Sequence, residues 1–295
     1  MNTSNAAGSI LVGVDGSEAS ARAVLWAEKQ SRLEGRPLVL VHAIDPRRNK
    51  WAGEYGFGMT QFVEAIEAGG RELLETARAA VRLDANDKLD VQTIFELADP
   101  RQVLMDLSDE ASMIVVGSRG YGPVRSLLLG SVSIALTQHA RCPVVVMRPQ
   151  EADDSQRQIV VGLSGFQPLS SAAEFAFRQA SLRSLPLTIL HGFWDPTLGH
   201  TDTAPHAMQA LAYADEAQQV LKTVAGMTEK FRDVVVTYRI AKGLPDDSLL
   251  AASKDAGMVV VGARHKSTLS ARLEGQVSRT VTEHAHCVVA VVPEL

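Results

Sequence analysis

The sequence has little cysteine, no excess of positive charge and no long apolar run. Its 295 residues include only two cysteines, Cys142 and Cys287, and each precedes a valine-rich run. We therefore expect two buried core thiols, with a functional disulfide as the weaker alternative. The net charge is −5 and the basic residues are dispersed, which argues against a nucleic-acid partner. No stretch of eighteen apolar residues exists, so no membrane span is expected.

The usual signatures of targeting and of catalysis are missing as well. Residues 1–9 (MNTSNAAGS) contain neither the basic nor the apolar segment of a signal peptide, so a cytoplasmic protein is expected. Neither a Walker loop nor a G-x-S-x-G elbow occurs, and there is no H-x-G-H or S-G-G-x-D-S stretch of adenylate-transferring enzymes. No Cys/His cluster has metal-ligand spacing. We expect neither catalytic residues nor a protein metal site.

The sequence repeats itself once. The run Ile10–Gly16 (ILVGVDG) returns as Ile159–Gly165 (IVVGLSG), and Val115–Arg119 (VVGSR) returns as Val260–Arg264 (VVGAR). Two copies of this length are domains rather than solenoid repeats. We predict domains at residues 1–150 and 157–295, joined by the polar linker 150–158 (QEADDSQRQ).

Short apolar runs alternate with longer helical stretches in each half. Four of the five runs of the first half are nearly continuous in Val, Ile and Leu, as in strands that helices cover on both faces; the runs are Ile10–Val14, Leu38–Ile44, Val91–Glu96, Met113–Val116 and Val144–Met147. Helix starts are indicated at Ser17, at Asp99-Pro100 and at Pro245. The fold class predicted for each half is therefore α/β, a doubly wound parallel sheet of about five strands.

Ligands of such sheets bind beyond the carboxyl ends of the strands, where the strand order reverses. Asp15 follows the first strand, placed to accept from ribose hydroxyls or to help hold a divalent cation. The glycine-rich stretch 117–125 (GSRGYGPVR) follows the fourth strand and leads to Gly130-Ser131, at the start of a predicted helix. Glycine backbone and a helix N-terminus suit a polyphosphate, to which serine hydroxyls and the two arginines of the stretch would add donors and positive charge.

The spacing of Gly117, Gly120, Gly130 and Ser131 resembles the nucleotide-binding signature of the ATP-binding branch of the universal stress protein family. The resemblance covers nearly the whole chain and is closest to tandem actinobacterial members. It implies an ATP-binding stress or regulatory protein, with Asp15 and the backbone near Val41–Ala43 around the adenosine. It also implies that the last strands of the two halves pair with each other. The nominated ATP-binding residues are Gly13, Asp15, Val41, Ala43, Gly117, Ser118, Arg119, Gly120, Tyr121, Gly122, Arg125, Gly130, Ser131, Val132 and Ser133.

Other interpretations stay open at this point. Gly117 could form a simple turn, Asp15 could cap the first helix, and Arg119 could be a solvated loop charge. His42 and His191 recur at strand ends, and His139 and His284 near helix ends, where the helix dipole alone favours them. The alternatives for the whole protein are a slow ATPase or an interaction protein without nucleotide. A bound Mg²⁺, a homodimer and a downstream partner are also left open.

The second copy of the glycine-rich stretch is degenerate. It keeps Gly262 and Gly275, but His265 replaces the middle glycine and Gln276 replaces the serine. Ser164 stands where the first copy has Asp15. We therefore predict one ATP per chain, bound by the N-terminal half.

Overall fold

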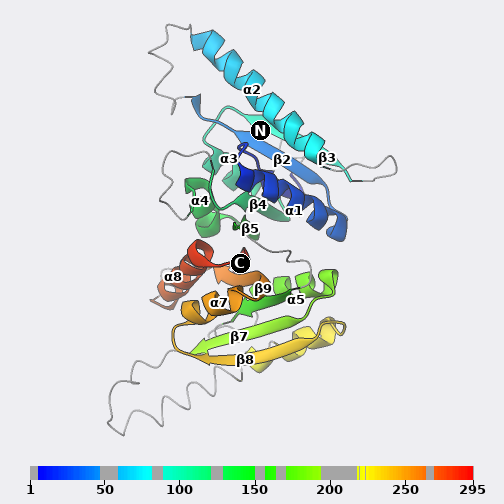
Figure 1. The fold of residues 1–295 in the computed structure, drawn as a ribbon, viewed down its shortest axis with the longest axis vertical. Helices are drawn as coiled ribbons and strands as arrows, with labels where there is room; N and C mark the ends of the chain where they lie inside the picture. Colours follow the sequence, from blue (N-terminus) through cyan, green and yellow to red (C-terminus); the bar gives the residue numbers. More distant parts are fainter. Residues whose placement is uncertain are drawn as a thin grey trace. The chain divides into compact units, whose positions relative to one another are not determined.

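The computed structural model describes residues 6–46, 59–81, 89–120, 129–149, 157–163, 171–193, 218, 220–222, 224–263 and 269–294. The chain divides into two compact units, Met1–Met147 and Arg148–Leu295. Each is an α/β unit with a parallel sheet, which confirms the predicted fold class (Figure 1).

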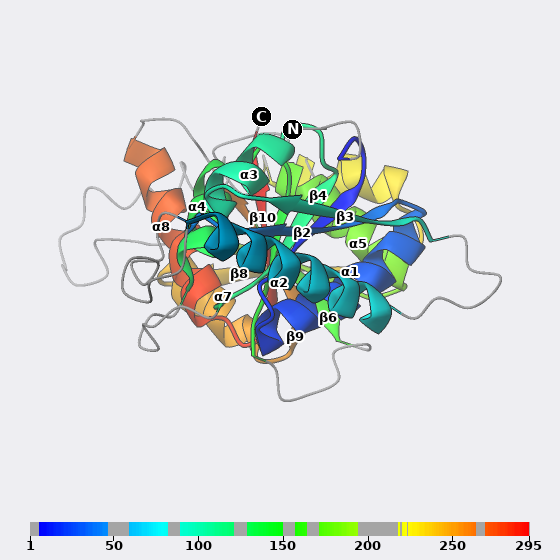
Figure 2. The ribbon, with the colours of Figure 1, turned by 90° about the horizontal axis from the view of Figure 1, so that it is seen from above.

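The N-terminal unit contains five parallel strands in the order β3-β2-β1-β4-β5. They are β1 (Ile10–Gly13), β2 (Leu38–Ala43), β3 (Val91–Glu96), β4 (Met113–Gly117) and β5 (Val144–Met147). Helices α1 (Glu18–Glu34) and α2 (Met59–Ala80) cover one face of the sheet, and α3 (Pro100–Leu107) and α4 (Ser131–His139) cover the other (Figure 2). Every predicted strand of this unit is present, with its ends within one residue of the prediction.

Helix boundaries in this unit follow local capping chemistry. Ser17 is the N-cap of α1, and its hydroxyl accepts from the backbone N–H of Ser20 at 3.1 Å. Asp99 caps α3, and Pro100 occupies its first turn. These residues satisfy backbone donors that a helix leaves free at its N-terminus. The predicted starts at Ser17 and Asp99-Pro100 are confirmed.

The C-terminal unit repeats the arrangement, with strands in the order β8-β7-β6-β9-β10. They are β6 (Gln158–Gly162), β7 (Leu187–Phe193), β8 (Val236–Lys242), β9 (Ala256–Ala263) and β10 (Val288–Pro293). Helix α5 (Ser171–Arg183) packs on one side of this sheet, and α7 (Pro245–Ser253) and α8 (Leu269–His284) pack together against β9. Pro245 begins α7 as predicted.

Each unit buries its own apolar core. All four apolar residues of β4 that precede Gly117 are buried, as are those of β5, because helices cover both faces of the strands. Among the described helices, none is long and apolar enough to cross a membrane.

Candidate functional site

The nominated residues that the structure describes lie at or near the carboxyl ends of β1, β2 and β4 and at the start of α4. Strands β1 and β4 are neighbours, while the chain leaves β1 toward β2 on its other side. The strand order therefore reverses between β1 and β4, which is where an open parallel sheet binds its ligand. Asp15 lies just after one strand, and Gly117 ends the other.

Ser17 holds the carboxylate of Asp15. The backbone N–H of Ser17 donates to Oδ1 of Asp15 at 3.0 Å, and the Ser17 hydroxyl donates to the same oxygen at 2.6 Å. The cap of α1 is thus Ser17, and Asp15 is the acceptor behind it. Because both bonds go to Oδ1, the orientation of the exposed carboxylate is fixed, and Oδ2 faces the glycine-rich connection.

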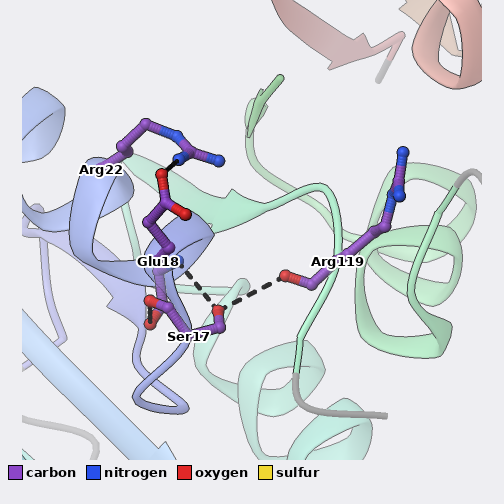
Figure 3. A network of polar contacts seen from close by, with 5 residues as sticks. Ser17, Glu18, Arg22 and Arg119 are labelled. Atoms are coloured by element: carbon purple, nitrogen blue, oxygen red, sulfur yellow. Dashed lines mark hydrogen bonds and ion pairs between the residues drawn. The ribbon is translucent and has the colours of Figure 1, made fainter. Parts of the chain in front are cut away.

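Ser17, in the loop between β1 and α1, also approaches the backbone of the glycine-rich connection between β4 and α4. The Ser17 hydroxyl lies 3.5 Å from the carbonyl oxygen of Arg119, and Figure 3 shows the Arg119 guanidinium pointing away from Ser17. A hydroxyl has one proton to donate, and Ser17 donates it to Asp15 at 2.6 Å. The interaction of the Ser17 hydroxyl with the Arg119 carbonyl is therefore weak. The exposed Arg119 side chain is therefore available to an anion above the loop.

Two glycines of the connection are required by close contacts. A Cβ on Gly117 would lie 2.8 Å from Cβ of Ala19 in α1, and a Cβ on Gly120 would lie 2.0 Å from Oδ2 of Asp15. Neither glycine has a positive φ. Gly117 lets α1 approach β4, and Gly120 makes room for the carboxylate. Hence a substitution at either position perturbs the apo fold as well as any bound ligand.

The N-terminus of helix α4 lies beside Arg119 and Gly120, and no side chain caps it. Gly130 is its N-cap residue, in extended conformation, with no side-chain hydrogen bond to the helix, and its own N–H donates to the carbonyl of Ser118 at 2.8 Å. Ser131 is exposed, and Val132 packs partly against the core. The buried Ser133 hydroxyl donates to the carbonyl of Gly117 at 2.7 Å, so it braces β4 against α4. The free N–H groups of the first turn and the helix dipole favour an anion here.

The β2 side of the site is tied to β1 through both peptide groups of Val14. The N–H of Val14 donates to the carbonyl of Val41 at 2.8 Å, and Nδ1 of His42 lies 2.7 Å from the carbonyl of Val14. A carbonyl only accepts, so Nδ1 of His42 carries the proton. We call these two hydrogen bonds the histidine clamp. They fix the direction in which the chain leaves β1, beside the nominated Gly13 and Ala43.

Sequence reasoning missed the contributions of Ser17 and His42 to this site. The signal for Ser17 was its place two residues after Asp15, the spacing at which an aspartate accepts from the backbone. The recurrence of His42 as His191 was noticed, but only the structure shows what the ring bonds. Tyr121, Gly122 and Arg125 lie outside the described residues, so their predicted roles stay predictions.

The C-terminal unit has the same histidine clamp, but no helix begins just after Gly275 as α4 begins just after Gly130. Nδ1 of His191 donates to the carbonyl of Leu163 at 2.9 Å, and the N–H of Leu163 donates to that of Leu190 at 3.0 Å. Helix α8 begins at Leu269, so Gly275 and the exposed Gln276 lie inside it. Their N–H groups are therefore helical donors, unlike those after Gly130. Ser164 and His265 lie outside the described residues.

The remaining titratable groups give no indication of chemistry. Both cysteines are buried and neither forms a disulfide, and burial raises the pKa of the Cys142 thiol to about 12. His139 and His284 are the last residues of α4 and α8. Within the described ranges, no group of three His, Cys, Asp or Glu side chains could hold a metal ion.

Comparison with known proteins gives consistent matches along both units. The sequence pattern of the universal stress protein family matches residues 7–148 and 156–293. A universal stress protein of Mycolicibacterium smegmatis is 35% identical over 293 residues, 96% of each chain. A universal stress protein of Mycobacterium tuberculosis is 31% identical over 302 residues, 100% of this chain and 99% of the relative. The crystal structure of a universal stress protein from Archaeoglobus fulgidus covers 99% of this chain and 98% of its own with a TM-score of 0.64; at 18% identity, this likeness concerns the fold alone.

Proposed function

The chain belongs to the universal stress protein family, and on that premise we propose that it is a regulatory protein whose N-terminal unit binds ATP as a ligand rather than as fuel. The observation that carries this proposal is the uncapped N-terminus of α4, which adjoins an exposed carboxylate across the reversal point of the sheet. An uncapped helix start is a polarised set of free N–H donors. The motif resemblance supports the phosphates of ATP as this anion.

Each part of the nucleotide has a proposed partner. The phosphates accept from the N–H groups of Ser131, Val132 and Ser133 and pair with Arg119. The ribose hydroxyls donate to Oδ2 of Asp15, the oxygen that Ser17 leaves available. The adenine lies near the backbone of Val41–Ala43. Asp15 would also be available to help hold a Mg²⁺ ion that the phosphates bind.

No part of the described site suggests turnover. Asp15 is held by Ser17, and Ser133 is committed to the Gly117 carbonyl, so neither is poised as a general base toward a water at the phosphates. We therefore propose that the bound nucleotide sets the state of the protein, which acts in the cytoplasm.

The test is to purify the protein without added nucleotide, denature it and identify released small molecules by mass. We expect ATP, and also a rise in melting temperature on adding ATP, because a ligand at a hundredfold excess over its Kd stabilises the folded state by about 2.7 kcal/mol. Asp15→Ala should lose most of the rise. Asp106→Ala is the matched control, since this exposed carboxylate on α3 accepts from Gln102 and lies away from the site.

The same measurements decide between this proposal and an interaction protein without nucleotide. If no nucleotide is released, and ATP leaves the melting temperature of the wild-type protein unchanged, the proposal is wrong. An ATP-dependent rise that is equal in wild type and Asp15→Ala would contradict the assigned site.

A further inference from the structure

In the C-terminal unit a carboxylate lies at the carboxyl ends of β9 and β10, beside the start of α5. There the strand order reverses between β6 and β9, and Glu294 follows β10, the neighbour of β9. The N–H of Glu294 donates to the carbonyl of Ala263 at 3.0 Å, which continues the β9–β10 ladder by one residue. The backbone of Glu294 is thereby fixed at the carboxyl end of the sheet.

The two oxygens of the Glu294 side chain lie between β9 and α5. Oε2 accepts from the backbone N–H of Ser171, the first residue of α5, at 3.1 Å. Oε1 lies 3.3 Å from where a Cβ on Gly262 would be. A carboxylate at a helix N-terminus takes the place of an external anion, because it satisfies a free N–H and complements the helix dipole.

The N-terminal unit has no such group at the equivalent position. Gly117, the counterpart of Gly262, faces Ala19 and the carbonyl of Arg119. When the two copies are aligned on Cys142 and Cys287, the counterpart of Glu294 is Pro149. At the position that follows the last strand, the carboxylate is therefore found in the C-terminal unit and not in the N-terminal unit.

We propose that Glu294 is the internal anion of the C-terminal unit and that its carboxylate excludes phosphate-bearing ligands from the space beside Gly262. A triphosphate entering there meets a like charge that is fixed by its backbone, and it must displace the carboxylate from the Ser171 N–H. Glu294 is thus a specificity-determining residue that limits the chain to one nucleotide. This inference rests on the proposed function, in which the N-terminal unit binds ATP.

The experiment compares the wild-type chain with Glu294→Ala and Glu294→Gln, each also made in a chain that carries Asp15→Ala. The probes are ATP and inorganic tripolyphosphate, measured by equilibrium dialysis. We expect one ATP per wild-type chain. In Glu294→Ala a second binding event should appear, at least tenfold tighter than any binding of the wild-type C-terminal unit. Glu294→Gln, which loses the charge but keeps the bulk, should show a smaller gain.

Two further measurements locate the effect. A photoreactive azido-ATP should label peptides around β9 in Glu294→Ala and not in the wild-type protein. Glu283→Gln is the matched control, because this half-buried carboxylate near the end of α8 pairs with the exposed Arg279 at 2.8 Å. It should leave the stoichiometry at one.

The failures of the two proposals are distinguishable. Wild-type protein that binds no ATP contradicts the proposed function, while the difference between Asp15→Ala and its double variant with Glu294→Ala still measures exclusion by Glu294. If Glu294→Ala is folded by its melting curve, and neither probe binds the double variant more tightly than Asp15→Ala alone, the inference about Glu294 is overturned.

Discussion

At the scale of residues, the single hydroxyl of Ser17 both accepts and donates a hydrogen bond that matters to the site. Its oxygen accepts from the N–H of Ser20 and so caps α1, while its proton goes to Asp15. Helix nucleation and carboxylate orientation therefore depend on the same side chain.

Replacing Ser17 with Ala should affect both stability and ligand binding. Loss of the cap should lower the free energy of unfolding by about 1 kcal/mol, measured by urea denaturation. Loss of the bond to Asp15 should also weaken ATP binding, measured by calorimetry at a temperature where the variant is folded. Ser17→Thr keeps the hydroxyl and serves as the control. Equal ATP affinity in wild type and Ser17→Ala would show that Ser17 does not position Asp15.

The buried Cys142 thiol should be inert in the folded protein. Its pKa is raised to about 12 by burial, and only the thiolate reacts, so about one thiol in ten thousand is reactive at pH 8. Iodoacetamide followed by peptide mass analysis should find Cys142 unmodified until denaturant is added. The same shift lowers the free energy of unfolding above pH 9.0, because the unfolded thiol then ionises and the folded one does not. Rapid labelling at pH 8 without denaturant would contradict the burial.

At the scale of elements, the glycines of the β4–α4 connection separate into two kinds. Gly117 is fixed by the approach of α1, whereas a Cβ on Gly130 would meet its nearest atoms at 3.7 Å, an ordinary contact. Of the glycines that the structure describes in this connection, Gly130 alone can therefore be substituted without forcing its neighbours apart.

Gly130→Ser should move stability and binding in opposite directions. Serine is a preferred N-cap, so the variant should gain a few tenths of a kcal/mol in the free energy of unfolding. Its hydroxyl would accept from an N–H that the phosphates use, so ATP binding should weaken. Gly117→Ala should instead lose about 1–3 kcal/mol by overpacking against Ala19. Urea denaturation and calorimetry of both variants check this, and tighter ATP binding by Gly130→Ser would place the phosphates elsewhere.

Elements that depend on local chemistry could be predicted from the sequence. Most of the strands are nearly continuous apolar runs. Ser17 and Asp99 mark helix starts because their side chains cap the helix, and Pro245 does so because its ring suits the first turn. The start of α8 does not follow from the repeat. Gly275 is the counterpart of Gly130, the N-cap of α4, but it lies inside the continuous helix α8. Contacts between distant segments were also invisible, among them Gly120 with Asp15 and Glu294 with Ser171.

At the scale of the whole molecule, one nucleotide per chain should protect only one of the two units. ATP binding suppresses opening of the segments that it contacts, so amide hydrogen exchange should slow in peptides covering β1 and β4. Peptides covering β6 and β9 should exchange at unchanged rates. In Gly130→Ser the protection of β1 and β4 should shrink at the same ATP concentration. Equal protection of both units in the wild-type protein would contradict a single site.

The recurring histidine clamp gives the molecule an internal spectroscopic reference. Nδ1 of His42 and of His191 each donates to a carbonyl just past a first strand, at 2.7 and 2.9 Å. The two rings share this hydrogen bond, but only His42 lies in the unit with Asp15. Their ring-nitrogen resonances would drift together with temperature or ionic strength. A divergence between them during a titration therefore isolates the event at one unit, without a second sample.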